Sequence, residues 1–238
     1  MIEKIIAAAE IASGDVVVEA GPGRGALTEK IAAVTDPILI EADSDLIPQL
    51  TAKYPQATII HADAAQVDYD ALLPPPTSST PWIFISNLPY NAGNAILMQV
   101  LMAKHPPKHL VVMVQKEVGE RMLAVKGSES VLTVATNLYA HVERVCKVAP
   151  GAFTPPPKVD SVVLKLTPYS SDIDREKVIA LAKTGFHNRR KQLHGNLSEA
   201  GIATSAEVKE ILVGFGLSPL ARAEELSLEN WIALSDKL

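Results

Sequence analysis

The fold is decided by Val16-Val17-Val18-Glu19-Ala20-Gly21-Pro22-Gly23-Arg24-Gly25, a short apolar run followed by alternating glycines. An apolar run of this length before turn residues is typical of a buried strand in a parallel sheet. Glycine tolerates positive φ and lets a ligand approach the backbone, so the stretch predicts a tight turn from strand to helix with a ligand beside it. Taken alone the signal is weak, because a turn without a ligand has the same sequence requirements.

Helical and extended patterns alternate on both sides of this turn, which is typical of parallel strands joined by crossover helices. The expected strands cover residues 16–19, 38–41, 57–60, 82–86 and 110–114, followed by an antiparallel pair at 142–148 and 159–166. The expected helices cover residues 1–12, 26–33, 46–53, 94–103 and 117–125. The proline-rich tract at 73–81 fits neither a helix nor a central strand and predicts a surface loop.

A change of pattern near residues 167–173 predicts a second domain, because only helical patterns follow it. The expected helices cover residues 174–190, 192–199, 206–213 and 228–235. We therefore predict a Rossmann-like α/β domain at residues 1–168 and a small all-helical domain at residues 169–238.

Composition narrows the class of protein. The chain has 238 residues, of which 47% are hydrophobic, and a net charge of −5. No stretch approaches the roughly 18 apolar residues of a membrane span and no secretion signal is evident, so a globular cytoplasmic protein is expected. Cys146 is the single cysteine and the histidines lack metal-ligand spacing, so no metal is expected. Lysines and arginines are concentrated at 144–191, which predicts a basic face there.

Two acids follow the next strands, where a nucleoside ligand at the glycine turn would meet them. Glu41 ends the second expected strand, where a carboxylate can accept both ribose hydroxyls, and Asp63 is placed to accept from an adenine amine. The turn differs from a dinucleotide G-x-G-x-x-G and follows an acid, which suits S-adenosylmethionine with its cationic end and no pyrophosphate. Taken singly, each acid is more often a solvated carboxylate. The expected donor site comprises Glu19, Gly21, Gly23, Glu41, Ala42, Asp63, Ala64 and Asn87.

The tetrapeptide Asn87-Leu88-Pro89-Tyr90 ends the fourth expected strand and indicates methylation of an adenine amine. This amine is a poor nucleophile because its lone pair is delocalised into the ring. An Asn side-chain carbonyl and a neighbouring main-chain carbonyl can accept its protons while the Tyr ring stacks on a base taken out of its helix. Phe153 is the candidate for a second stacking face. The alternative for the tetrapeptide is an ordinary turn after a strand, and the alternative for Phe153 is a position in the core. The expected catalytic residues are Asn87, Leu88, Pro89, Tyr90 and Phe153.

With these motifs the chain resembles the KsgA-type ribosomal RNA adenine dimethyltransferase family, relatives of the Erm resistance methyltransferases. The matching stretches are residues 18–28, 87–91, 115–118 with Arg121, 153–161, Phe186 with 188–191, and 222–224. The resemblance implies a class I S-adenosylmethionine-dependent methyltransferase fold. It implies as substrate two adjacent adenosines in the 3'-terminal hairpin of small-subunit rRNA, each converted to N6,N6-dimethyladenosine. It also implies that RNA is engaged by Lys158, Arg189, Arg190 and Lys191.

Three departures from the family pattern keep alternatives open. Family members begin with an F-x-Q-x-F-L segment that covers the donor, whereas this sequence starts at Met1-Ile2-Glu3, within the following helix. The Y-G-x-L-S-V stretch is replaced by residues 127–134, and residues 91–94 lack the usual Ser or Thr. We expect a monomeric enzyme that acts on small-subunit rRNA within an immature ribosomal subunit. The alternatives are an Erm-like enzyme of large-subunit rRNA and a non-catalytic RNA-binding assembly factor.

Overall fold

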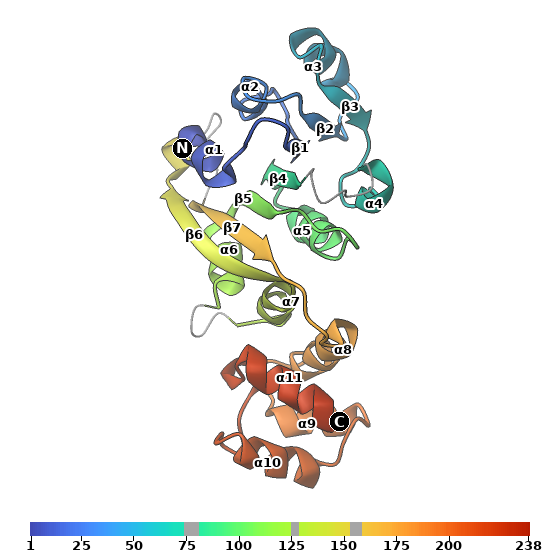
Figure 1. Ribbon diagram of the computed structural model, residues 1–238. Coiled ribbons are helices and arrows are strands. Elements are labelled where there is room, and N and C mark those ends of the chain that lie inside the picture. Colours follow the sequence, from blue (N-terminus) through green and yellow to red (C-terminus); the bar gives the residue numbers. More distant parts are fainter. Residues whose placement is uncertain (74–80, 125–128, 153–158) are drawn as a thin grey trace. The chain divides into compact units, whose positions relative to one another are not determined.

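Figure 1 shows the computed structural model, which describes residues 1–73, 81–124, 129–152 and 159–238. The chain divides into two compact units. The first comprises Met1–Gly119 and Ala140–Tyr169, and the second comprises Glu120–Tyr139 and Ser170–Leu238. The division differs from the single boundary expected near residue 168, because the segment at 120–139 belongs to the second unit.

A seven-stranded sheet forms the centre of the first unit, in the order β3-β2-β1-β4-β5-β7-β6 (Figure 1). The parallel strands are β1 (Val16–Ala20), β2 (Ile38–Glu41), β3 (Thr58–His61), β4 (Trp82–Asn87) and β5 (His109–Gln115). The antiparallel pair β6 (Ala140–Val148) and β7 (Ser161–Pro168) continues the sheet beyond β5. The strand order reverses between β1 and β4, and the carboxyl ends of such neighbours flank the point where α/β sheets bind ligands.

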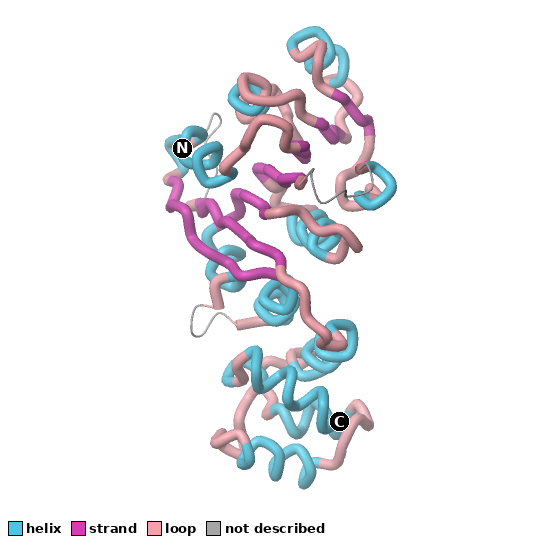
Figure 2. Tube along the Cα trace, in the orientation of Figure 1, coloured by secondary structure: helices cyan, strands magenta, loops and turns pink. Residues whose placement is uncertain are grey.

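Short helices connect these strands, as the cyan segments of Figure 2 show. In the first unit they are α1 (Ile2–Ala9), α2 (Thr28–Ile31), α3 (Ile47–Lys53), α4 (Tyr69–Leu72) and α5 (Gly93–Leu101). Helix α6 (Lys116–Met122) follows β5 directly and continues into the second unit. The second unit also contains α7 (Val131–Tyr139), α8 (Arg175–Gly185), α9 (Leu193–Glu199), α10 (Ser205–Gly214) and α11 (Leu228–Lys237). None of the helices in the described segments is long and apolar enough to span a bilayer.

The central strands of the sheet are buried on both faces, which explains their continuous apolar sequences. On one face, Ile5 and Ala9 of α1 pack against Val17, Ile83 and Val111. At about 25 cal/mol per Å² of apolar surface, each such large side chain contributes roughly 1.5–3 kcal/mol. The rigid sheet therefore holds the residues at its strand ends in fixed positions.

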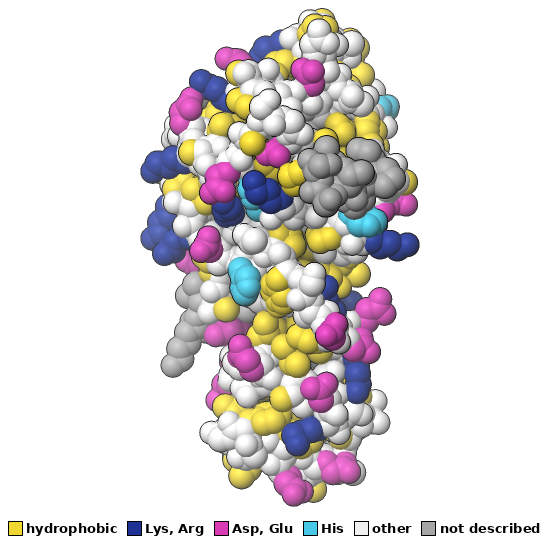
Figure 3. Space-filling model, viewed as in Figure 1, with side chains coloured by type: hydrophobic (Ala, Val, Ile, Leu, Met, Phe, Trp, Pro, Cys, Tyr) yellow, Lys and Arg dark blue, Asp and Glu magenta, His cyan; other side chains and the backbone are white. Residues whose placement is uncertain are grey.

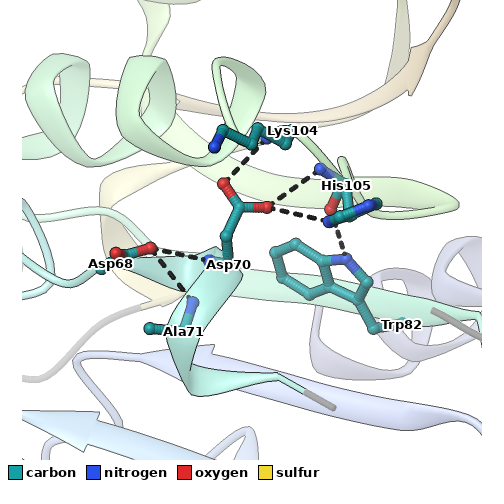
Figure 4. A network of polar contacts seen from close by, with 6 residues as sticks. All are labelled: Asp68, Asp70, Ala71, Trp82, Lys104 and His105. Carbon is teal, nitrogen blue, oxygen red and sulfur yellow. Dashed lines mark hydrogen bonds and ion pairs between the residues drawn. The ribbon is translucent and has the colours of Figure 1, made fainter. Parts of the chain in front are cut away.

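A polar network ties α4 to the loop before β5 (Figure 4). The Asp70 carboxylate accepts the backbone N–H groups of Lys104 at 2.9 Å and His105 at 3.0 Å, and lies 3.2 Å from His105 Nδ1. The Trp82 indole donates to the His105 carbonyl at 2.9 Å. Asp68 caps α4 by accepting the amides of Asp70 and Ala71. Because Trp82 begins β4, this network lies at the end of the sheet opposite to Asn87.

The predicted strands agree with the structure to within two residues, and the helices agree less well. Helix 26–33 is reduced to the single turn of α2, because the preceding turn continues past Gly25, whose φ is +80°. Helices α4 and α7 were not expected, since one is a single turn and the other is rich in β-branched residues. Most of the proline-rich tract lies outside the described residues.

Helix α8 ends at Gly185, earlier than the predicted residue 190. A Cβ at this position would lie 2.4 Å from the Trp231 ring, so glycine is required for α8 to pack on α11. Phe186 stacks on the same ring, with centroids 5.6 Å apart. The chain leaves the helix at Phe186, and residues 186–191 form a turn.

Candidate active site

The carboxyl ends of β1 and β4 bring the glycine turn and the tetrapeptide together. Ala20 pairs with Ser86 in register, and the buried Ser86 hydroxyl donates to the Ala20 carbonyl at 2.7 Å. Gly21 N–H donates to the Ile40 carbonyl of β2 at 2.9 Å. The end of β1 is thereby fixed to both neighbouring strands, and Ser86 directly precedes Asn87.

The three glycines of the turn have positive φ values for two different reasons. A Cβ built at Gly21 (φ +64°) or Gly23 (φ +55°) meets no atom within 4 Å, so these residues border open space. A Cβ at Gly25 would lie 2.6 Å from the Tyr54 hydroxyl, which donates to the Gly25 carbonyl at 2.8 Å. Gly25 therefore serves packing, whereas Gly21 and Gly23 leave the backbone accessible to a ligand.

Glu41 and Glu19 are the buried acids beside this turn. Glu41 is 7% exposed, and its two carboxylate oxygens accept the N–H groups of Gly23 and Asp43, each at 3.0 Å. Glu19 is 1% exposed and accepts the Thr28 hydroxyl at 2.7 Å. Burial raises the pKa of the Glu19 carboxyl to about 7, the Thr28 hydrogen bond acts in the opposite direction, and the Glu41 carboxylate adds to the rise. Glu19 is thus a buried acid that changes charge near neutral pH.

Asp63 and the alanines next to the acids complete the predicted donor set. The exposed Asp63 carboxylate accepts from Ala65 N at 2.9 Å and Gln66 Nε2 at 3.2 Å, so its orientation is fixed at the end of β3. Ala64 is buried and its carbonyl accepts the Tyr69 hydroxyl at 2.9 Å. Ala42 is exposed after β2. These residues follow neighbouring strands at the same edge of the sheet.

The tetrapeptide is held by its backbone and by one side chain. Leu88 N–H donates to the Met113 carbonyl at 3.1 Å, and the Pro89 carbonyl accepts Gly93 N–H at 2.7 Å. The Leu88 side chain is buried. The Asn87 side chain is exposed and has no hydrogen bond to any residue that the structure describes, and Tyr90 is 55% exposed. The turn is therefore rigid while its amide and its ring remain available.

A shallow pocket that opens to solvent adjoins the tetrapeptide. Sequence reasoning gave no role to Gln115 and Val118, which line it. Their signal was the match of residues 115–118 to the family pattern, together with the position of Gln115 at the end of β5, the strand beside β4. The lining residues are Leu88, Pro89, Tyr90, Gly93, Asn94, Val114, Gln115 and Val118.

The remaining predicted site residues belong to the second unit or lie outside the described residues. Phe153 and Lys158 lie outside the described residues. The chain next to that segment is anchored, since the Asp160 carbonyl accepts Lys116 N–H at 2.9 Å and Ser161 pairs with Gln115. The basic stretch Arg189–Lys191 belongs to the second unit.

Comparison with known proteins gives this arrangement a family. The family model "Ribosomal RNA adenine dimethylase" matches residues 1–238. The chain is 36% identical to the "Ribosomal RNA small subunit methyltransferase A" of Dehalococcoides mccartyi, over 97% of this chain and 81% of that protein. It is also 36% identical to the protein of that name from Synechococcus elongatus, over 100% of this chain and 90% of that protein.

Two solved structures have the same fold over nearly their whole length. A dimethyladenosine transferase from Plasmodium falciparum has a TM-score of 0.79 at 26% identity, covering 99% of this chain and 95% of that one. The 23S rRNA methyltransferase ErmE has a TM-score of 0.75 at 27% identity, covering 100% and 96%. The class I methyltransferase fold and the family expected from the sequence are confirmed. The chain belongs to the ribosomal RNA adenine dimethylase family, whose members are enzymes that use S-adenosylmethionine as methyl donor.

Proposed function

We propose that this enzyme converts two adjacent adenosines in the 3'-terminal hairpin of small-subunit rRNA into N6,N6-dimethyladenosine. The observation that carries the proposal is the rigid tetrapeptide at the carboxyl end of β4, whose Asn87 amide and Tyr90 ring are free beside a pocket that opens to solvent. The small-subunit target is supported by the relatives of that name, which are 36% identical over 97% or more of this chain. The RNA target implies action in the cytoplasm, and we expect a monomer.

The residues at the glycine turn fit S-adenosylmethionine, which supplies an electrophilic methyl group when bound. Gly21 and Gly23 border open space and tolerate close approach of a ligand. Glu41 would accept the ribose hydroxyls, Asp63 with its neighbours Ala42 and Ala64 would contact the adenine, and the anionic form of Glu19 would attract the cationic end. An ionised carboxylate roughly doubles the strength of such hydrogen bonds relative to a neutral acceptor.

On the acceptor side, two carbonyl oxygens would accept the protons of the adenine amine. One belongs to the Asn87 side chain. The other is the Leu88 main-chain carbonyl, since the Pro89 carbonyl is occupied by Gly93 N–H and no backbone bond among the described residues uses that of Leu88. Accepting both protons localises the amine lone pair for in-line attack. The amine loses its proton after transfer, so positioning and polarisation are the catalytic tasks and no general base is required.

The target base would be held by stacking. Tyr90 supplies one face, and Phe153 is proposed as the other. Stacking on an aromatic side chain contributes about 1–3 kcal/mol per base, enough to offset much of the cost of unstacking. Lys158 and the basic stretch Arg189–Lys191 would contact the RNA backbone.

Methyl transfer from labelled S-adenosylmethionine tests the proposal. Unmethylated small ribosomal subunits should be labelled, and digestion should yield dimethyladenosine from two neighbouring positions. Label in large-subunit rRNA instead would favour the Erm-like alternative, which has support in the fold of ErmE. Absence of donor binding at millimolar concentration would favour a non-catalytic assembly factor.

A further inference from the structure

Asp63 is exposed, yet its carboxylate is held in one orientation. Figure 3 shows acidic side chains scattered over the face in view, and an exposed side chain ordinarily changes rotamer freely. The Asp63 carboxylate instead accepts Ala65 N–H at 2.9 Å and Gln66 Nε2 at 3.2 Å. The Asp63 carbonyl accepts Gln66 N–H at 2.8 Å. The direction of the carboxylate therefore depends on the backbone of the loop after β3.

One peptide group of this loop is hydrogen-bonded on both sides. It joins Ala64 to Ala65, and its N–H is the one that donates to the Asp63 carboxylate. Its carbonyl accepts the Tyr69 hydroxyl at 2.9 Å, and no backbone N–H in the described part of the chain donates to that carbonyl. Because the N–H and carbonyl of a peptide lie in one plane, the Tyr69 hydroxyl fixes the direction of the Ala65 N–H. A hydrogen bond to the carbonyl also polarises the peptide and strengthens the bond that its N–H makes.

The Tyr69 hydroxyl is itself fixed by packing against the sheet. Tyr69 begins α4 and is 2% exposed. Its ring stacks on Trp82, with centroids 6.0 Å apart, and meets Phe84 edge-on, with centroids 6.1 Å apart. Both partners belong to β4, the middle strand of the sheet. Burial raises the pKa of the Tyr69 hydroxyl, and the Asp63 carboxylate adds to the rise, so the hydroxyl keeps its proton and remains a donor.

We propose that Tyr69 is a positioning residue for the adenine of the methyl donor, and that it acts through the Ala64–Ala65 peptide on the Asp63 carboxylate. The inference rests on the proposed function, in which Asp63 contacts that adenine. It makes a specific claim about selectivity, because only a ligand with a 6-amino group can donate to an oriented carboxylate. Tyr69 would not touch the donor, because it is buried and its hydroxyl is bonded to the loop backbone.

Titration calorimetry of the full chain with two ligands tests the inference. The ligands are S-adenosylhomocysteine and its analogue in which hydrogen replaces the 6-amino group. The wild-type protein should prefer the first ligand by at least about tenfold, and Asp63→Ala should abolish the preference. Tyr69→Phe keeps the ring and removes the hydroxyl. It should weaken binding of S-adenosylhomocysteine about three- to tenfold, the loss expected for one hydrogen bond, while binding of the analogue stays within about twofold of wild type.

Tyr54→Phe is the matched control. It also removes a buried hydroxyl that donates to a loop carbonyl, that of Gly25 at 2.8 Å, and it leaves the contacts of Asp63 unchanged. Its preference for S-adenosylhomocysteine over the analogue should equal that of wild type. In the double variant of Asp63→Ala and Tyr69→Phe, affinity for S-adenosylhomocysteine should match that of Asp63→Ala within about twofold, because the hydroxyl acts only through the carboxylate.

Equal weakening of both ligands by Tyr69→Phe, or an unchanged preference, would overturn the inference while the proposed function stands. If the wild-type protein does not bind S-adenosylhomocysteine, the proposed function fails as well. If Tyr69→Phe fails to fold, replacement of Tyr69 by 4-aminophenylalanine tests the same bond, because an aromatic amine is a weaker donor than a phenol. The preference should then fall below that of wild type, and an equal preference would overturn the inference.

Discussion

Replacement of Glu19 by glutamine should change how the stability of the donor-free protein depends on pH. Burial raises the pKa of Glu19 from an ordinary value of 4.5 to about 7. Between these values the folded protein keeps the proton and the unfolded chain releases it, so the stabilisation is complete below pH 4.5 and is lost as pH rises through 7. At about 1.4 kcal/mol per pKa unit, the loss is on the order of 3 kcal/mol.

Glu19→Gln has a side chain of nearly the same shape that does not ionise. Its free energy of unfolding relative to wild type should therefore increase by on the order of 3 kcal/mol between about pH 5 and pH 8, measured by urea denaturation without donor. Glu29→Gln on α2 removes an exposed carboxylate and should stay within about 0.5 kcal/mol of wild type throughout. A stability difference between Glu19→Gln and wild type that does not vary with pH would show that the ionisation of Glu19 does not destabilise the folded protein.

The same variant separates the stabilising and donor-binding roles. In the wild-type protein, donor affinity should fall as the pH falls through about 7, because the protonated carboxyl no longer attracts the cationic ligand. Glu19→Gln should bind the donor more weakly at pH 8 and lose this dependence. Titration calorimetry across this range measures both, and equal affinity of the two proteins at pH 8 would contradict the assigned role.

Three further changes have distinct expected outcomes. Tyr90→Ala should weaken binding of the target base by about 1–3 kcal/mol, which would be measured as a raised KM for subunits with unchanged donor affinity. Tyr90→Phe, which keeps the ring, should behave as wild type. An unaffected KM for Tyr90→Ala would contradict stacking. Asp70→Ala should lower stability by about 1–3 kcal/mol in thermal denaturation because two amides lose their acceptor, and the activity of the folded enzyme should be unchanged. Asp70→Asn, which keeps an oxygen acceptor, is the control. A loss of activity in the folded Asp70→Ala protein would count against a purely structural network. Gly23→Ala should reduce donor affinity more than stability, and Gly25→Ala should do the reverse because its Cβ meets Tyr54; equal effects would contradict the division of the glycine turn.

The sequence was most informative where a residue has a local reason for its position. Buried parallel strands such as β4 have apolar runs that can be recognised without tertiary information, and the glycine turn and tetrapeptide follow such runs directly. Glu41 could be assigned to the donor site because it ends an expected parallel strand, next to the strand that leads into the glycine turn. The order of these motifs along the chain was therefore sufficient to predict the edge of the sheet where they meet.

Other features depend on contacts between distant residues and were not predictable from one sequence. Helix α7 belongs to the second unit. Gly185, the last residue of α8, packs against Trp231, which is 46 positions away by residue number. The distinction between Gly23 and Gly25 depends on Tyr54. The ion pair of Lys191 depends on Glu199, which lies on the next helix.

The rate of methyl transfer by Asn87→Ala measures directly whether the Asn87 side chain activates the adenine amine. Asn87 is exposed and its side chain makes no hydrogen bond within the described structure, so the variant should fold and should bind small subunits as wild type does. We expect a single-turnover rate at saturating donor and subunits that is lower by at least about 10²-fold, the usual cost of removing one polarising group. A folded Asn87→Ala variant that methylates adenosine at the wild-type rate would contradict the role of Asn87 in polarising the amine.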